Sequence, residues 1–402
     1  MDNFKLYAVL GKPVFFSRSP LIYNTAFQSW GIKARYLRLS ADNEVEALRT
    51  AEEMGIFGLN ITSPFKETIF PHLDRFDLHS QKIRAVNTII RKNGLYLGYN
   101  TDYIGIIRSL LNQNIIPKGK KALILGAGGA ARAAAYGLHQ AGLKTLLIAN
   151  RNKKRAEEVA SNFQGFSLSL DEVKSILPKV DIIISCIPDL SAVLNPKALP
   201  SHLVILEAGY SKSISAHIKK AHQPLVISGL EWLLYQALES LFLFTKRRTW
   251  PTLRAKIKSV IYLPRAIKTN LAFTGFMASG KSTIAQLVAS ELGYKFIDTD
   301  QEIEKVCGCS IADIFSKAGE EKFRKIESSL IIKLLQNTER TVFSLGGGAV
   351  TNPKTARLLK ESCQVIWIWV SPKQLLQRAS SSLRPLLSQN LEGNKLERLL
   401  SS

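Results

Sequence analysis

Short apolar runs alternate with helix-like segments over the first hundred residues. The runs at 7–10, 34–39 and 58–61 have the length and composition of strands, whereas residues 20–30 and 43–54 have the composition of helices. Strands that alternate with helices in this way predict a largely parallel sheet covered by helices, which is an α/β fold.

A second series of the same kind begins near residue 121. Strands are predicted at 122–125, 144–149, 181–187, 203–206 and 224–227. A well-patterned helix at 229–245 follows, and we expect it to pack back onto the first domain. The pattern therefore predicts a domain at 1–103, completed by this helix, and a second domain at 104–228.

Two further segments follow residue 245, a basic stretch and a third domain. Residues 246–268 are basic and contain two prolines, so we expect them to form a linker. A third domain at 269–402 then begins, again with a strand, a glycine-rich loop and a helix. We find no internal repeat and no low-complexity segment.

Composition places the chain among globular proteins with ordinary cores. Of the 402 residues, 46% are hydrophobic and 21% are charged, and no apolar run approaches membrane-spanning length. No signal peptide is evident, and four scattered cysteines suit reduced thiols, so a cytoplasmic location is expected. The net charge of +22 would attract polyanions, yet no nucleic-acid-binding motif accompanies it. Nucleic-acid and membrane partners are therefore not expected, and the oligomeric state stays open.

A glycine-rich turn follows the strand at 122–125. It has the sequence Gly126-Ala127-Gly128-Gly129, and strong helix formers continue from Ala130. A strand, a glycine turn and a helix form the usual cradle for a dinucleotide, because glycines let the backbone approach the pyrophosphate and the helix N-terminus favours its charge.

The end of the next strand indicates which dinucleotide binds. An NAD site usually carries an acid there to bind the ribose hydroxyls. This chain has no acid at that point and has instead a polar and cationic run that includes Asn150, Arg151, Asn152 and Arg155. Cations suit the 2′-phosphate of NADP, so NADP is the predicted cofactor.

Four polar clusters precede the glycine turn, each at a strand end or in a loop. They supply hydroxyl, amide, ammonium and carboxylate groups that suit a small polyhydroxylated acid. The clusters are 17–20, 60–66, 85–88 and 100–102.

In this order, the clusters and the glycine turn resemble shikimate dehydrogenase over residues 4–246. The resemblance implies an α/β substrate-binding domain, a Rossmann domain for NADP, and reduction of 3-dehydroshikimate to shikimate. It implies that Lys66 and Asp102 form the catalytic pair, which fits a ketone reduction, because the developing alkoxide needs a nearby cation and a proton. Which of the two transfers the proton stays open. Phe16 departs from the family, which usually has histidine there.

The same resemblance implies the ligands of the substrate and cofactor. Ser17 and Ser19 would hold the substrate carboxylate, with Tyr210 near that end. The residues that would bind the ring hydroxyls are Asn60, Thr62, Asn87 and Gln236. Gly229 would belong to the cofactor site.

The third domain contains a second phosphate-binding motif. Residues 271–282 read LAFTGFMASGKS, a strand followed by the P-loop pattern from Gly275 to Ser282. Its backbone would cradle the phosphates of ATP, Lys281 would reach the terminal phosphates, and Ser282 would ligate Mg²⁺. The predicted nucleotide-binding residues are Gly275, Ala278, Ser279, Gly280, Lys281, Ser282 and Thr283.

The residues after the P-loop resemble shikimate kinase. They include the pair Asp298 and Asp300, the series GEEKFR at 319–324, the glycines at 346–348 and LRPLL at 383–387. The resemblance implies that Asp298 supports Mg²⁺ and that Asp300 acts catalytically on the hydroxyl being phosphorylated. Shikimate would be held by Arg324, Gly346, Gly347 and Gly348, and Arg384 would belong to a lid over the phosphates.

Only 15 residues follow Leu387, whereas the family continues further, so we expect a truncated kinase domain in which nucleotide binding is favoured over turnover. Impairment, completion by another chain and truncation of the sequence all stay open.

The two resemblances together imply consecutive steps of chorismate and aromatic amino-acid biosynthesis. The alternative is a quinate-type NADP-dependent dehydrogenase that carries a non-catalytic nucleotide-binding P-loop module.

Overall fold

The computed structural model describes residues 4–210, 224–264 and 268–380. The chain forms two compact units, residues 1–263 and residues 264–402, and each is described by itself. No helix in the described residues is long and apolar enough to cross a membrane.

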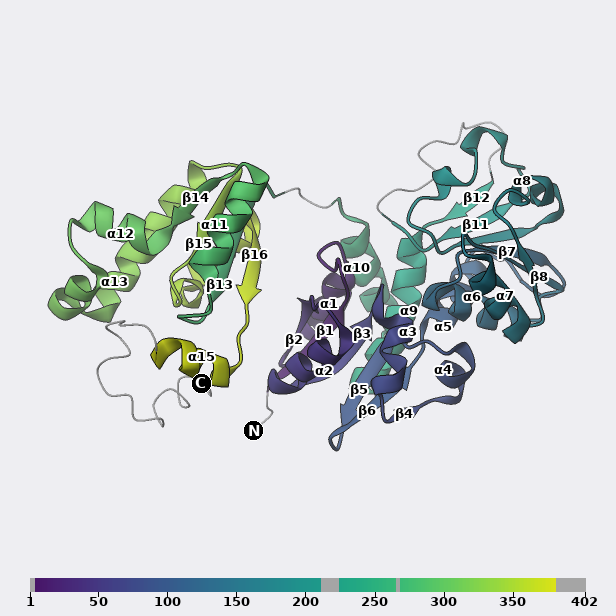
Figure 1. The fold of residues 1–402 in the computed structure, drawn as a ribbon, viewed down its shortest axis with the longest axis horizontal. Coiled ribbons are helices and arrows are strands. Elements are labelled where there is room, and N and C mark those ends of the chain that lie inside the picture. Colours follow the sequence, from purple (N-terminus) through teal and green to yellow (C-terminus); the bar gives the residue numbers. More distant parts are fainter. Residues whose placement is uncertain (1–3, 211–223, 265–267, 381–402) are drawn as a thin grey trace. The chain divides into compact units, whose positions relative to one another are not determined.

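The first unit begins with a six-stranded sheet in the order β2-β1-β3-β5-β6-β4 (Figure 1). Strands β1, β2 and β3 are parallel, as the sequence pattern predicts, but β5 runs antiparallel to both β3 and β6. The strands are β1 Lys5–Leu10, β2 Ala34–Leu39, β3 Ile56–Ile61, β4 Arg75–Phe76, β5 Thr88–Lys92 and β6 Leu95–Tyr99.

The antiparallel hairpin of β5 and β6 brings one reversed strand, β5, into a sheet that is otherwise parallel, as the sequence pattern predicts. Its two-residue turn is Asn93-Gly94, and both residues have positive φ, 52° and 80°. Asparagine and glycine tolerate that conformation, and an Asn-Gly turn between apolar runs is the strongest short hairpin signal. The signal was therefore present in the sequence.

Helices cover this first sheet and contribute to its cores. Tyr23 of α1 stacks on Tyr36 of β2 with ring centroids 4.1 Å apart, and both rings are fully buried. The helices are α1 Ser19–Ser29, α2 Glu44–Glu53, α3 Phe65–Thr68 and α4 Leu78–Ile83.

The second sheet is entirely parallel, in the order β12-β11-β10-β7-β8-β9. The chain leaves β7 for β8 on one side and returns to β10 on the other, so the strand order reverses beside β7. Ligands of such sheets bind at this reversal, at the carboxyl ends of the strands. The strands are β7 Lys121–Leu125, β8 Thr145–Ala149, β9 Phe166–Leu168, β10 Ile182–Ser185, β11 Val204–Glu207 and β12 Leu225–Ile227. The helices that accompany this sheet are α6 Gly129–Gln140, α7 Lys153–Asn162 and α8 Val173–Ile176. Each sheet of the first unit, together with its helices, is called a lobe below.

Two helices lie between the sheets, α5 Asp102–Leu111 and α9 Gly229–Thr245 (Figure 1). They pack closely, as Gly105 shows: a Cβ there would come within 2.9 Å of the Trp232 backbone oxygen. Leu234, Ala237 and Leu241 of α9 are buried in the same core as α1. The start of α5 therefore lies where the two lobes meet.

The expected linker at 246–268 is largely a helix, α10 Pro251–Tyr262, which packs against α1 and α9. Leu253, Ile257 and Ile261 recur at helical spacing and are buried in the α1–α9 core. Basic charge and two prolines favour a linker, but Pro251 occupies the first turn of the helix, where proline is well tolerated. The basic residues face outward or pair with acids, as Lys258 does with Glu231.

The second unit contains a four-stranded parallel sheet in the order β14-β15-β13-β16. Its strands are β13 Asn270–Gly275, β14 Lys295–Asp298, β15 Thr341–Ser344 and β16 Cys363–Ile368. Its helices are α11 Lys281–Leu292, α12 Thr299–Cys307, α13 Ile311–Gln336, α14 Pro353–Ser362 and α15 Pro372–Ser380.

The docking of α10 predicts a clear stability effect. Ile257→Ala should lower the free energy of unfolding of the first unit by about 2–5 kcal/mol, because it leaves a cavity in a buried core. Ser259→Ala, on the exposed face of the same helix, is the control and should cost little. Urea unfolding of both full-length variants measures the difference, and a neutral Ile257→Ala would show that residues 251–262 are not packed.

Candidate active sites

A cavity of about 520 Å³ lies in the first unit, and residues from both lobes line it. It brings together residues that the sequence analysis assigned separately to substrate, catalysis and cofactor. The predicted residues in its wall are Ser17, Ser19, Asn60, Thr62, Lys66, Asn87, Asp102, Gly128, Gly129, Ala130, Arg155, Tyr210, Gly229 and Gln236. Phe16, the departure from the family, also lines it.

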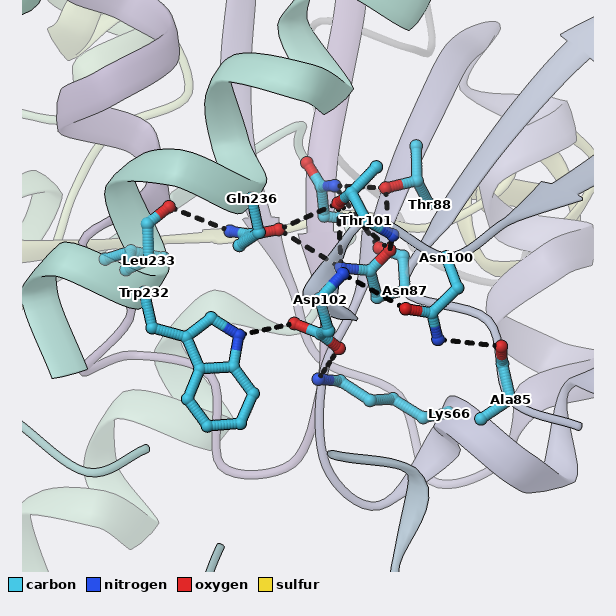
Figure 2. Close-up of polar contacts among 11 residues, drawn as sticks. Lys66, Ala85, Asn87, Thr88, Asn100, Thr101, Asp102, Trp232, Leu233 and Gln236 are labelled. Carbon is cyan, nitrogen blue, oxygen red and sulfur yellow. Dashed lines mark hydrogen bonds and ion pairs between the residues drawn. The ribbon is translucent and has the colours of Figure 1, made fainter. Parts of the chain in front are cut away.

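The predicted catalytic pair is formed in this cavity (Figure 2). Lys66 Nζ lies 2.6 Å from Asp102 Oδ2, and the two side chains are 17% and 6% exposed. Asp102 is the first residue of α5, where the helix dipole favours a negative charge. Its other oxygen, Oδ1, accepts a hydrogen bond of 3.2 Å from Trp232 Nε1. The carboxylate is therefore held from both sides, and Trp232 is a contact that the sequence analysis missed.

The next group is a hydrogen-bond network around Asn87. Its Nδ2 donates to Gln236 Oε1 at 3.1 Å and to Thr101 Oγ1 at 3.0 Å, and its Oδ1 accepts from the Thr101 backbone N–H at 2.7 Å (Figure 2). Gln236 Nε2 donates to the backbone oxygen of Leu233. The network fixes these amides in the wall of the cavity that holds the predicted catalytic pair.

Asn60 is also in the cavity wall, but its amide already has partners in the protein. Its Nδ2 donates to Ser240 Oγ at 2.8 Å and to Thr88 Oγ1 at 3.0 Å, and its Oδ1 accepts from Tyr36 Oη at 2.6 Å. The side chain therefore ties β3 to β2, β5 and α9 and supports the wall of the cavity.

Ser17 and Ser19, the two serines predicted to bind the substrate carboxylate, face each other across one turn. Ser17 Oγ and Ser19 Oγ are 3.1 Å apart, and the Arg38 guanidinium donates to the backbone oxygen of Ser17. Arg18 holds the same turn from outside, because its Nη1 donates to the backbone oxygens of Ile261 and Leu263 at the end of α10. The last helix of the unit therefore braces the serine turn, a contact that the sequence pattern did not indicate.

The glycine turn fits the backbone approach that a dinucleotide needs. Gly126 has φ 110°, which favours glycine, and a Cβ on Gly129 would come within 2.7 Å of Lys66 Cβ. Gly229 is equally confined, because a Cβ there would lie 2.6 Å from the Glu207 backbone oxygen. Ala127, within the same turn, is buried.

The predicted 2′-phosphate region follows β8. Asn152 caps α7 by accepting from the Arg155 backbone N–H, and Asn150 donates to the backbone oxygen of Asn152. Arg151 is exposed, and the Arg155 guanidinium donates to both oxygens of Glu67 at 2.8 Å. Residues 150–156, which directly follow β8, contain no carboxylate, so the residues present fit NADP.

One further group in the cavity is the thiol of Cys186, which lies against Gly126. Burial raises the pKa of this thiol to about 12. The thiol is therefore protonated near neutral pH and serves as packing.

The second unit forms the predicted P-loop. Gly275 has φ 150°, and a Cβ there would lie 2.4 Å from the Ile368 backbone oxygen, while Gly280 and Ala278 have φ 90° and 61°. Lys281 Nζ donates to the Phe276 backbone oxygen across the loop. The predicted residues Ser279 and Thr283 belong to this loop and to the start of α11.

The predicted magnesium ligands are adjacent. Ser282 Oγ donates to Asp298 Oδ2 at 2.8 Å, while Asp298 Oδ1 caps α12 by accepting from the Asp300 backbone N–H. A hydroxyl and a carboxylate beside a phosphate loop fit Mg²⁺, which usually takes one or two protein ligands together with phosphate and water. The described residues contain no cluster of three or more His, Cys, Asp or Glu suited to a metal.

The predicted shikimate residues of this unit also converge. A Cβ on Gly346 would come within 2.7 Å of Asp300 Oδ1, and a Cβ on Gly348 within 2.4 Å of the Arg324 guanidinium. Arg324 pairs with Glu327 at 2.8 Å. Burial, together with the charges of Asp298 and Glu327, raises the pKa of Asp300 to about 6.

Glu327 is a second acid that the sequence analysis did not assign to the site. It is buried, and burial raises its pKa. Gly347 lies between the two confined glycines, and Arg384 lies outside the described residues.

Family models match three stretches of the chain. The model for the shikimate dehydrogenase substrate binding domain matches residues 9–89, that for shikimate / quinate 5-dehydrogenase matches 110–204, and that for shikimate kinase matches 277–402. The matches fall on the two lobes of the first unit and on the P-loop unit.

Curated relatives of the first unit are named shikimate dehydrogenase (NADP(+)). The protein of Moorella thermoacetica is 36% identical over 260 residues, which cover 60% of this chain and 88% of the relative. The protein of Saccharolobus solfataricus is 38% identical over 245 residues, covering 59% of this chain and 87% of the relative.

Solved structures agree with this relationship. The shikimate dehydrogenase of Aquifex aeolicus has 30% identity and a TM-score of 0.58, covering 64% of this chain and 99% of that one. The enzyme of Thermus thermophilus, solved with NADP(H) and shikimate, has 29% identity and a TM-score of 0.56, with 64% and 99% covered.

The raised pKa of Asp300 predicts a pH-dependent stability. A carboxyl whose pKa is higher in the folded state favours folding while it is protonated, and it loses that advantage as pH rises through about 6. Asp300→Asn should therefore be more stable than the unsubstituted chain by about 1–3 kcal/mol at about pH 8, and nearly equal to it at about pH 4. Calorimetric unfolding of the P-loop unit across this range measures the difference. An offset independent of pH would show that ionisation of Asp300 is not its cause.

Proposed function

The chain belongs to the shikimate dehydrogenase family and carries a shikimate kinase domain, and from this premise we propose that its first unit reduces 3-dehydroshikimate to shikimate with NADPH. The observation that carries the proposal is the ion pair of Lys66 and Asp102, which shares one cavity with the glycine turn at 126–129. A proton-donating cation and a dinucleotide cradle in one cavity suit the reduction of a ketone.

We propose that the proton comes from Lys66. Asp102 accepts at both oxygens, from Lys66 and from Trp232, which is the geometry of an ionised carboxylate with no proton to give. The Lys66 ammonium has three protons and is close enough to stabilise a developing alkoxide. Asp102 then holds the ammonium in place and supports its charge.

The bound cofactor would supply the hydride, and the chain's residues would hold both partners. Ser17, Ser19 and Tyr210 would bind the substrate carboxylate, and Thr62, Asn87 and Gln236 would bind the ring hydroxyls. Asn60, whose amide is engaged by neighbouring side chains, would support these ligands from behind.

For the second unit we propose phosphorylation of shikimate with ATP. Lys281 and the loop of Gly275, Ala278 and Gly280 would bind the phosphates, and Ser282 with Asp298 would hold Mg²⁺. Asp300 would accept the proton of the attacking hydroxyl, a role that suits a carboxyl with a pKa of about 6. Arg324 would bind the substrate beside the glycines at 346–348. The product of the first unit is thus the substrate of the second, and a cytoplasmic location stays a prediction.

The catalytic pair can be tested by substitution. Lys66→Met and Asp102→Asn should each lower the rate of NADPH oxidation with 3-dehydroshikimate by about 10²–10⁴-fold, because each removes part of the proton-transfer pair. The matched controls are Lys12→Met and Asp42→Asn, which break an exposed ion pair of the same 2.6 Å length. Equal activity in the cavity variants and the controls would contradict the assignment. The rate of quinate oxidation with NADP is measured in the same proteins, because a quinate-type dehydrogenase is the alternative.

The kinase proposal has an independent test in the same chain. Lys281→Ala should abolish shikimate-dependent ADP release and leave NADPH oxidation unchanged, because the two sites belong to different units. Following the two signals separately in one reaction measures both. ATP binding without ADP release by the unsubstituted chain would favour a non-catalytic nucleotide module.

A further inference from the structure

A carboxylate of the substrate lobe lies inside the predicted cofactor site. Glu67 follows Lys66 in α3, and its Oε1 lies 3.5 Å from the position that a Cβ on Gly128 would occupy. Gly128 belongs to the glycine turn where an anionic pyrophosphate is expected to approach the backbone. A protein carboxylate is therefore placed next to the position of the cofactor phosphates.

The partners of Glu67 are two arginines of the other lobe. Arg155 Nη2 lies 2.8 Å from both carboxylate oxygens, and Arg132 Nε lies 3.0 Å from Oε2. Arg155 is also the predicted ligand of the cofactor's 2′-phosphate. The same guanidinium is thus paired with an anion of the protein itself.

Arg132 indicates that this region has capacity for a further anion. Its side chain is 6% exposed and pairs with Glu67 and, at 2.7 Å, with Glu158. Its third nitrogen, Nη1, is buried without a hydrogen-bond partner in the described residues. A buried guanidinium is costly to leave without an acceptor, so the cluster retains unused donor capacity beside the carboxylate.

We propose that Glu67 competes with the 2′-phosphate for Arg155 and thereby sets how strongly the enzyme distinguishes NADP from NAD, an inference that rests on the proposed dehydrogenase function. Binding of a 2′-phosphate exchanges the Arg155–Glu67 ion pair for an Arg155–phosphate pair. A nucleotide without that phosphate leaves the internal pair in place. Glu67 therefore weakens the binding of NADP and leaves that of NAD nearly unchanged.

Two adenosine nucleotides isolate this effect without the reaction. Adenosine 2′,5′-bisphosphate carries the 2′-phosphate, and adenosine 5′-monophosphate lacks it. All proteins carry Lys281→Ala, so that the P-loop unit does not contribute. Isothermal calorimetry should show that Glu67→Gln tightens binding of the bisphosphate roughly threefold to fivefold, the scale of a partly exposed ion pair. Binding of the monophosphate should change less than twofold.

Glu158→Gln is the matched control. It removes an equal charge from the same arginine cluster, but Glu158 contacts Arg132 and not Arg155 in the ion pairs of the described residues. It should leave the affinity for the bisphosphate unchanged. Glu67→Ser is a second neutral replacement with the same expectation as Glu67→Gln, and thermal unfolding reports whether each variant is folded.

Three results would overturn the proposal. They are weaker or unchanged bisphosphate binding by both Glu67 variants, equal tightening for the two nucleotides, and equal tightening by Glu158→Gln. If the enzyme oxidises NADPH normally while one of these results is found, only the role of Glu67 falls. If neither bisphosphate binding nor NADPH oxidation is found, the proposed dehydrogenase function falls with it.

Discussion

The ion pair of Lys66 and Asp102 links the helices that line the cavity of the first unit. The two residues come from α3 and from the first turn of α5, and their side chains are largely removed from water. Such a pair is stable only if the remaining donors and acceptors are satisfied, and Trp232 of α9 supplies the second contact to the carboxylate. Three helices must therefore be placed correctly for the pair to form.

Close backbone packing brings these helices within reach. Glycine at 129 allows the cofactor-binding helix to approach the stem of Lys66, and glycine at 105 allows α5 to approach the Trp232 turn of α9. A methyl group at either position would meet atoms closer than 3.0 Å, so the packing there would have to shift. The glycines of this unit thus serve lobe packing as well as phosphate binding.

The sequence predicts the strands, the two glycine loops and most cavity residues, because these depend on local periodicity and on motifs with a physical reason for each residue. Prediction from the sequence fails where the role of a residue depends on partners that are distant in the sequence. Trp232 and Glu67 look like an ordinary apolar helix residue and a surface acid until the fold brings them to Asp102 and Arg155. The sequence of residues 251–262 favours a linker because its charge is visible there, whereas the core that buries its three apolar residues comes from α1 and α9.

Both units use a strand, a glycine loop and a helix to bind phosphate, and in both an acid lies close to the loop. Asp298 accepts a hydrogen bond from Ser282. A divalent cation bound with the nucleotide would offset the repulsion between this carboxylate and the phosphates. The dehydrogenase cofactor brings no cation, so Glu67 must instead be neutralised by arginines of the opposite lobe. The same arrangement of a loop beside a carboxylate therefore favours a metal–nucleotide complex in one unit and a competition between anions in the other. This difference follows from the charge that each ligand carries into its site.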